Sequence, residues 1–252
     1  MPATPAWPPK STPRLFVPAP ITIDGSVHLT GNAAHYLTHV MRRAVGDPVK
    51  LCDDVGGEFL AELAAIGKRD CILSVRALLR AREAVDDFWL CASPVKRQRW
   101  DWLIEKATEL GVDKICPITM ERSIAERINL ERARAIAQEA AEQCDRTALP
   151  HIDTLQSLKQ LLANWPTERR LYFADENGGD GLLDVVQADG KIPAAVLIGP
   201  EGGFSESERA AIRALPAARG VTLGPQILRA ETAALAASAL ILAARRGAHS
   251  DR

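Results

Sequence analysis

Two segments near the end of the chain share the same order: an apolar run, a glycine-containing turn and the start of a helix. In the first, the apolar run 194–198 leads into the turn GPEGG, and the sequence SESE at 205–208 is a capping box. In the second, the apolar run 220–223 ends at Gly224, and a helix begins at Glu231. Buried strands that lead through short turns into helices predict an α/β fold with a mostly parallel sheet.

The alternation of strands and helices extends from residue 88 to residue 245. Apolar side chains recur at helical spacing before Gly111, which is a suitable helix stop, and Asn129 is placed to cap the next helix. We expect strands at 88–93, 114–118, 170–174, 194–198 and 220–223, and helices at 96–111, after Asn129, and at 155–164, 181–187, 206–215 and 231–245.

The part of the chain before residue 83 has a different pattern. Short apolar runs are separated by turn signals such as Asp24-Gly25 and Gly56-Gly57, which predicts a small barrel or sandwich. Strands are expected at 14–17, 21–23, 27–29, 48–53, 58–66 and 71–78, with one helix at 33–41. The polar stretch 80–87 marks the boundary, so we expect a flexible leader (1–13), a first domain (14–82) and a second domain (83–252).

Composition narrows the classes of function. The formal net charge is −1, so any contact with nucleic acid must come from local clusters of cations. The five cysteines form no CxxC pair and the histidines lack metal-ligand spacing, which indicates buried thiols in a reducing cytoplasm and no metal site. The leader lacks the pattern of a secretory signal, and the longest apolar run, 233–244, is shorter than the ~20 residues of a membrane span.

The two glycine turns are candidates for a shared binding site. Ligands bind at the carboxyl ends of strands in open α/β sheets, where glycines let the backbone come close. Apolar walls would come from Leu197, Leu223, Ile227 and Leu228. Neither turn has the phosphate-binding patterns of nicotinamide or Walker-type sites. On turn chemistry alone, a tight strand–helix turn that binds nothing remains an equal alternative.

The motif pair LIGPEGG at 197–203 and LGPQILRAETA at 223–233 resembles the signature of the RsmE family, the 16S rRNA uracil-N3 methyltransferases of the SPOUT class. Further segments resemble the same family: RLFV at 14–17, HVMR at 39–42, EKATELGV at 105–112 and EAAEQCDR at 139–146. The family usually has leucine where this chain has Met41. The resemblance covers nearly the whole chain from Arg14.

This resemblance implies a trefoil-knotted α/β domain preceded by a PUA-like, RNA-binding β-barrel, and a homodimer. It implies S-adenosylmethionine (SAM) as cofactor, without a metal or a membrane, and a specific uridine of 16S rRNA in the small ribosomal subunit as substrate. The implied cofactor-binding residues are Leu197, Ile198, Gly199, Pro200, Glu201, Gly203, Leu223, Gly224, Ile227, Leu228, Arg229 and Thr232.

Methylation at N3 needs an anion of the uracil imide, which a cation or N–H donors would stabilise. Arg146 is the first candidate for that role and Arg229 the second, with Glu231 or Glu139 as acceptor of the proton. Each of them has an ordinary salt bridge as its alternative role. RNA contacts are expected from Gln143 at the base edge and from two cationic clusters: Arg42, Arg43 and Lys50, and then Lys96, Arg97 and Arg99.

Two other classes of function remain open at this stage. Another SPOUT enzyme, acting on a ribose 2′-hydroxyl or on tRNA, would share the fold and the cofactor but not this motif pair. A non-catalytic assembly factor that binds rRNA would have a degenerate cofactor loop, whereas both glycine loops here are intact.

Overall fold

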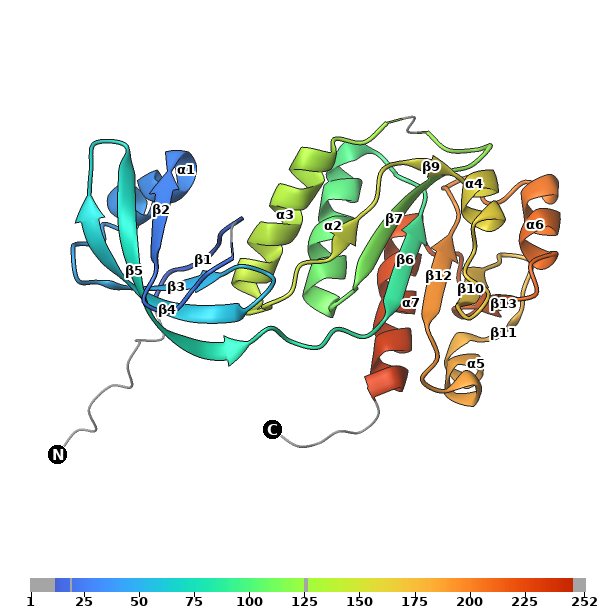
Figure 1. Cartoon of the computed structure of the whole chain (residues 1–252). Coiled ribbons are helices and arrows are strands. Elements are labelled where there is room, and N and C mark those ends of the chain that lie inside the picture. The colour runs from blue at the N-terminus through green and yellow to red at the C-terminus, as the bar shows by residue number, and fades with distance from the viewer. Residues whose placement is uncertain (1–11, 19, 125–126, 247–252) are drawn as a thin grey trace. The chain divides into compact units, whose positions relative to one another are not determined.

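The computed structural model describes residues 12–18, 20–124 and 127–246. The chain divides into two compact units, which Figure 1 shows in ribbon form. One unit runs to Ala84 and also includes Glu142–Ala148, and the other holds Val85–Ala141 and the chain from Leu149 on. The predicted leader lies outside the described residues except for Thr12 and Pro13.

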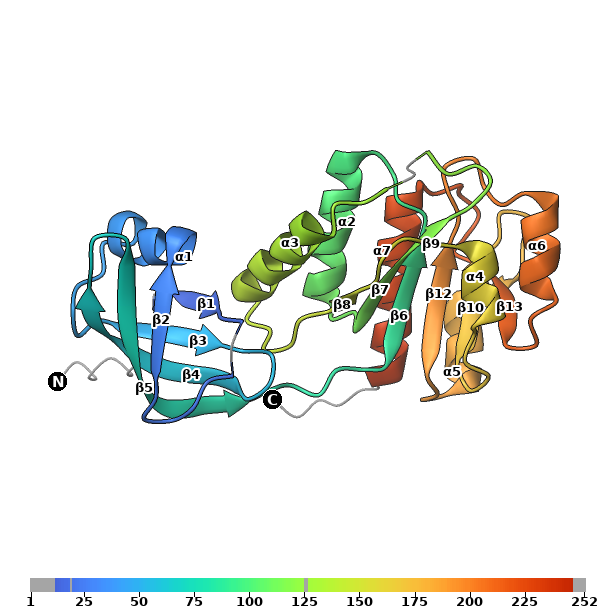
Figure 2. The same cartoon turned by 45° about the horizontal axis from the view of Figure 1, so that its top comes forward.

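The first unit is a curled five-stranded sheet (Figure 2). Its strand order is β1-β3-β4-β5-β2, with β1 parallel to β3 and the other neighbours antiparallel. Side chains that alternate along these strands enclose a core around Leu37, Leu51, Leu63 and Leu73. The strands are β1 (Arg14–Phe16), β2 (Ser26–Thr30), β3 (Pro48–Cys52), β4 (Gly57–Ile66) and β5 (Asp70–Ala81).

Two expectations for this unit were wrong in detail. Residues 21–23 form no strand, because the Ile21 N–H donates to the Asp53 carboxylate at 2.7 Å and the chain turns at Asp24, whose φ is 62°. The expected helix at 33–41 is α1 (Gly31–His35) followed by a π-helix, η1 (Tyr36–Val40). The Met41 N–H bonds to the Tyr36 carbonyl at 2.8 Å, which is the wider π spacing.

The second unit is built on a parallel sheet in the order β11-β13-β10-β12-β6-β7-β8, with β9 paired to β7. Every residue of the central strand β12 is buried, as expected for a strand covered on both faces. The strands are β6 (Phe88–Ala92), β7 (Lys114–Thr119), β8 (His151–Ile152), β9 (Gln156–Ser157), β10 (Arg170–Ala174), β11 (Asp180–Gly181), β12 (Ala194–Ile198) and β13 (Ala218–Thr222).

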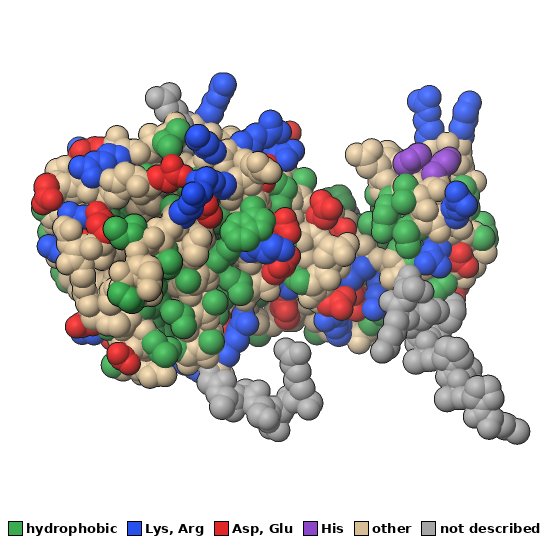
Figure 3. Space-filling view, turned by 180° about the vertical axis from the view of Figure 1, so that it is seen from behind, with side chains coloured by type: hydrophobic (Ala, Val, Ile, Leu, Met, Phe, Trp, Pro, Cys, Tyr) green, Lys and Arg blue, Asp and Glu red, His purple; other side chains and the backbone are tan. Residues whose placement is uncertain are grey.

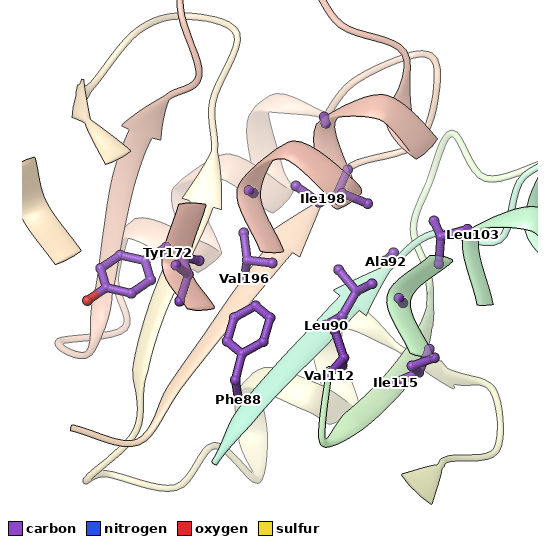
Figure 4. Close-up of a cluster of buried hydrophobic side chains, with 14 of the residues drawn as sticks. Phe88, Leu90, Ala92, Leu103, Val112, Ile115, Tyr172, Val196 and Ile198 are labelled. Atoms are coloured by element: carbon purple, nitrogen blue, oxygen red, sulfur yellow. The ribbon is translucent and has the colours of Figure 1, made fainter. Parts of the chain in front are cut away.

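Helices cover both faces of this sheet (Figure 1). One face packs on helices α2, α5 and α7, in the cluster of Phe88, Leu90 and Val196 that Figure 4 shows. The other face packs on α4 and α6 through Leu158, Leu161 and Ile212. The helices of the unit are α2 (Arg97–Leu110), α3 (Leu130–Gln143), α4 (Leu158–Ala163), α5 (Leu182–Asp189), α6 (Glu206–Arg213) and α7 (Ala230–Arg246).

Local signals set the helix ends in this unit. Gly111 ends α2 in the left-handed conformation with φ 93°, the Asn129 side chain accepts from the Arg132 N–H at 2.9 Å, and Ser205 forms the predicted capping box with Glu208. These three predictions are confirmed. Helix α4 begins later than predicted, because residues 156–157 pair with β7 and Ser157 caps the helix.

Strand order decides which loops meet. The two glycine turns follow β12 and β13, and β10 lies between these strands in the sheet. All three strands are parallel, so their carboxyl ends share one edge. The loop after β10 therefore lies between the two glycine turns, which the sequence did not indicate.

Candidate active site

Three loops at the carboxyl edge of the sheet enclose a cavity of about 640 Å³. They follow β10, β12 and β13, and their lining residues fall in the ranges 174–178, 198–204 and 221–230. Arg99 from α2 and Ala233 from α7 complete the lining. A concave site of this size, with apolar walls and a few polar groups, is typical of a cofactor site.

Glycines shape two of these loops. Gly203 has φ 69°, and a Cβ there would come within 2.5 Å of the Glu176 carboxylate. Gly224 has φ 125°, a conformation that other residues rarely adopt. The backbone of both loops can therefore approach a ligand in a way that bulkier residues would prevent.

Buried charges hold the loop after β10 in place. The fully buried Asp175 carboxylate accepts from Arg209 at 3.1 Å and from Arg213 at 2.7 Å, and Glu176 accepts from Arg209 at 2.6 Å. Burial by itself would lower the pKa of Arg209, but Asp175 and Glu176 raise it overall. These ion pairs fix the third wall of the cavity to α6, and sequence reasoning missed them because the partners are far apart in the chain.

Arg99, on α2, contacts both of the segments that contain the glycine turns. Its Nη1 donates to Glu201 Oε1 at 2.5 Å, in the turn after β12. Its Nε lies 3.4 Å from Oε1 of Glu231, in the first turn of α7. The other Glu231 oxygen, Oε2, is buried and has no hydrogen-bond partner within the described part of the chain. A guanidinium at the cavity is thus held by one exposed and one buried carboxylate.

Most of the residues implied as cofactor-binding line this cavity. Those in the lining are Ile198, Gly199, Pro200, Glu201, Gly203, Leu223, Gly224, Ile227, Leu228 and Arg229. Leu197 instead points into the core beside α4 and α6, and Thr232 is exposed on α7 outside the lining.

The other predicted site residues have different settings. Arg146 is buried in the first unit, where its Nε pairs with Glu83 at 3.0 Å and its carbonyl accepts from Arg14. Glu139 and Gln143 are exposed at the end of α3. Of the predicted RNA contacts, Arg42, Lys96 and Arg97 are exposed, and Arg43 and Lys50 are half-buried.

A second concave surface lies on the first unit, between α1, η1 and the turn from β4 to β5. The rings of His35 and His39 stack there at 4.6 Å, and Lys68 and Arg69 stand on the same lining. Figure 3 shows histidines side by side on this unit with Lys or Arg side chains near them. Thr38 donates its hydroxyl to the Ala34 carbonyl at 2.7 Å and so accepts from His39 Nδ1 at 2.8 Å. That bond leaves His39 Nε2 turned away from Thr38.

Each of the two units contains a segment that matches a known protein family. Residues 82–242 match the family model of an RNA methyltransferase domain, and residues 29–76 match that of an RNA methyltransferase PUA domain. The α/β fold class with a preceding PUA domain is therefore confirmed. No helix in the described part of the chain is long and apolar enough to cross a membrane, and no cluster of candidate metal ligands occurs there.

Relatives and solved structures cover nearly all of the chain. A protein of Bacillus subtilis named ribosomal RNA small subunit methyltransferase E is 31% identical over 84% of this chain and 88% of its own length. A Rickettsia conorii protein of the same name is 26% identical over 90% and 94%. The structure of a methyltransferase of that name from Neisseria gonorrhoeae, bound to SAM, matches with a TM-score of 0.80 and 28% identity over 90% of this chain and 95% of that one.

Proposed function

Because the chain belongs to the ribosomal RNA small subunit methyltransferase E family, we propose that it transfers the methyl group of SAM to N3 of one uridine in 16S rRNA. The observation that carries this proposal is the cavity at the carboxyl ends of β10, β12 and β13. Both family motifs supply its walls, and the motif positions that line it come from two separate loops.

The residues present fit SAM. Gly203 and Gly224 leave room for a ligand at the backbone, and Ile198, Leu223 and Leu228 give apolar walls for an adenine ring. The carboxylate of Glu176, which also lines the cavity, suits the positive charges of the cofactor. When bound, the cofactor supplies an electrophilic methyl group, so the protein mainly positions the two reactants.

The uracil must lose its N3 proton before it can take a methyl group. Its anion is spread over two carbonyl oxygens, so a nearby cation favours it. Arg229 lines the cavity and is exposed, which places a guanidinium where a base could enter. Arg146 and Glu231 stay predictions for the catalytic step. A stacked or paired base would have to swing out to reach the methyl group.

Contacts to the rRNA are proposed for both units. In the first unit, the proposed contacts are the predicted cations Arg42, Arg43 and Lys50. We add to them the concave surface of His35, His39, Lys68 and Arg69, where phosphates and stacked bases could bind. In the second unit, Lys96 and Arg97 are exposed at the start of α2. Gln143 is exposed at the end of α3, in the segment that belongs to the first unit. We also propose a homodimer, a trefoil knot in the second unit and a cytoplasmic site of action.

A methylation assay tests the proposal. Small subunits that lack their own modification are incubated with the protein and labelled SAM, and the labelled nucleoside is mapped by mass spectrometry. We expect N3-methyluridine at one 16S rRNA site. Label on a ribose or on tRNA would contradict the proposed substrate while keeping the cofactor. The absence of both label and SAM binding in calorimetry would instead favour an assembly factor.

A further inference from the structure

We infer that Arg99 is a catalytic residue of this site: its guanidinium stabilises the uracil imide anion, and Glu231 holds it in position. This inference rests on the proposed function and deepens it. The sequence places Arg99 only in a cationic cluster next to Lys96 and Arg97. The structure separates it from those neighbours, because Arg99 lines the cavity while they do not.

Of the two arginines that line this cavity in the described part of the chain, Arg99 is the one held in place. Glu201 and Glu231 contact it from two different loop segments, at 2.5 Å and 3.4 Å. Arg229 is exposed, and no ion pair is recorded for it among the described residues. A fixed cation stabilises a developing charge better than a free one, because little reorganisation is needed during the reaction.

The two carboxylates have different exposure, and this difference suggests their roles. The Glu231 side chain is 9% exposed, and a buried carboxylate needs a cation, so Arg99 stays against it. The Glu201 side chain is 35% exposed and lies on the turn after β12, so water can replace it as a partner of Arg99. A base that enters the cavity can therefore take the place of Glu201 while Glu231 still holds the guanidinium.

Arg99 has donors to spare for such a base. A guanidinium carries five N–H groups in a planar fork. The hydrogen bond to Glu201 uses one of them, on Nη1, and the ion pair with Glu231 lies on the Nε side at 3.4 Å. In the step we propose, N3 gives its proton to solvent water, and the resulting anion accepts N–H bonds from Arg99 at one carbonyl oxygen. The N3 lone pair then forms the bond to the methyl carbon, and the pair of the broken bond remains on sulfur. Arg99 keeps its charge throughout.

The test compares Arg99→Met and Arg99→Lys with the unaltered protein in single-turnover methylation of small subunits, with SAM and subunits saturating. The matched control is Arg134→Met, an exposed arginine on α3 outside the cavity. Because Arg99→Met leaves Glu231 buried without its cation, the double variant Arg99→Met with Glu231→Gln is measured alongside it. Calorimetry gives the SAM affinity of each variant, and thermal melting confirms that each is folded.

For Arg99→Met and for the double variant we expect a rate about 10²–10³-fold lower, with SAM affinity within about threefold of the unaltered protein. Arg99→Lys should recover part of the loss, because it keeps the charge but not the fork. The pH profile should shift as well. Without the cation the bound imide has a higher pKa, so the rate of Arg99→Met should level off at a higher pH.

Two results would overturn the inference. The first is a rate within about threefold of the unaltered protein for both methionine variants. The loss of a donor that stabilises the reacting anion should lower the rate by far more than that. The second is a loss seen only as weaker SAM binding with an unchanged pH profile, which would make Arg99 a structural latch between the loops. If the unaltered protein itself places no N3-methyl label on the subunits, the proposed function is wrong, and the role inferred for Arg99 is wrong as well.

Discussion

Asp53 illustrates how a single carboxylate organises a turn in the first unit. Its Oδ2 accepts from the Ile21 N–H at 2.7 Å, and its Oδ1 accepts from the N–H groups of Val55, Gly56 and Gly57 at 3.0, 2.7 and 3.2 Å. Burial alone would raise the pKa of Asp53, but these four donors lower it below the ordinary value of 3.8. The turn therefore depends on the ionised form of the Asp53 carboxylate, which accepts all four hydrogen bonds.

Replacing Asp53 with asparagine should destabilise the protein by about 1–3 kcal/mol at neutral pH, because an amide offers one acceptor oxygen and turns N–H groups toward donors. A depressed pKa contributes stability above the ordinary value of 3.8, and the contribution is lost as pH falls through the folded pKa. The variant should therefore lose less stability than the unaltered protein in that acid range. Denaturant melts at several pH values measure both effects. Asp24→Asn, at an exposed turn with φ 62°, is the control and should change little.

Arg99 marks the limit of sequence reasoning at the scale of residues. Lysines and arginines near a helix start are usually solvated, and nothing in the local sequence separates Arg99 from Arg97. The difference arises because the first turn of α2 lies against loops more than a hundred positions later in the chain. The turns at Gly203 and Gly224, in contrast, could be predicted, because each glycine by itself indicates a backbone that can adopt the positive φ found there.

At the scale of elements, the segment from β13 to α7 turns at a glycine whose backbone conformation is unfavourable for other residues. Gly224 has φ 125°, and an added Cβ would meet only the Gln226 side chain, at 3.8 Å. A substitution there adds backbone strain without a steric clash. Strain of about 1–3 kcal/mol is expected for such a conformation in a residue with a Cβ.

We predict that Gly224→Ala lowers the affinity for SAM about tenfold or more, because the loop relaxes away from the strained shape when no cofactor holds it. Calorimetric titration with SAM measures the change. Gly46→Ala is the matched control: Gly46 also has a positive φ, 93°, with open space at its Cβ, but it lies in the first unit. It should lower stability similarly and leave SAM affinity unchanged. Equal affinities for the two variants would contradict the role given to the β13–α7 loop.

Most elements of the second unit could be predicted because local patterns determine them. Periodic apolar side chains predicted helices α2, α3 and α7. A glycine predicted the end of α2, and a capping side chain predicted the start of α3. Strand order depends on pairing between distant segments, so the position of β10 between β12 and β13 could not be read from the sequence. Short two-residue strands such as β8 and β11 have too few side chains for any periodic signal.

At the scale of the whole molecule, the first unit also contains a segment from far along the chain. Residues 142–148 comprise the last two residues of α3 and the chain after it, yet they pack with the first unit. There Glu142 accepts from the Phe16 N–H at 2.8 Å, and Thr147 accepts from the Glu83 N–H at 2.8 Å. A boundary drawn from composition assigns each stretch of sequence to one side only. It therefore misses a segment that returns to the earlier unit.

The proposed homodimer leads to a prediction at this same scale. Trp102 on α2 and Leu240 on α7 are 43% and 37% exposed, and these two helices pack against each other in the second unit. A contiguous apolar patch on a protein surface is typical of an interface, and we propose that these two side chains belong to one. Sedimentation should therefore give a particle of twice the chain mass of 27.3 kDa at micromolar concentration.

Trp102→Glu should shift the sedimenting species to the mass of one chain, because a charge placed in an apolar interface stays unpaired. Ile72→Glu provides the control, since Ile72 is similarly exposed, at 41%, but lies on β5 of the first unit. A dimer that survives Trp102→Glu would place the interface elsewhere, whereas an unaltered protein that sediments as a single chain would contradict the dimer. If Trp102→Glu yields folded monomers that still bind SAM but do not methylate small subunits, the second copy is needed to hold the RNA rather than the cofactor.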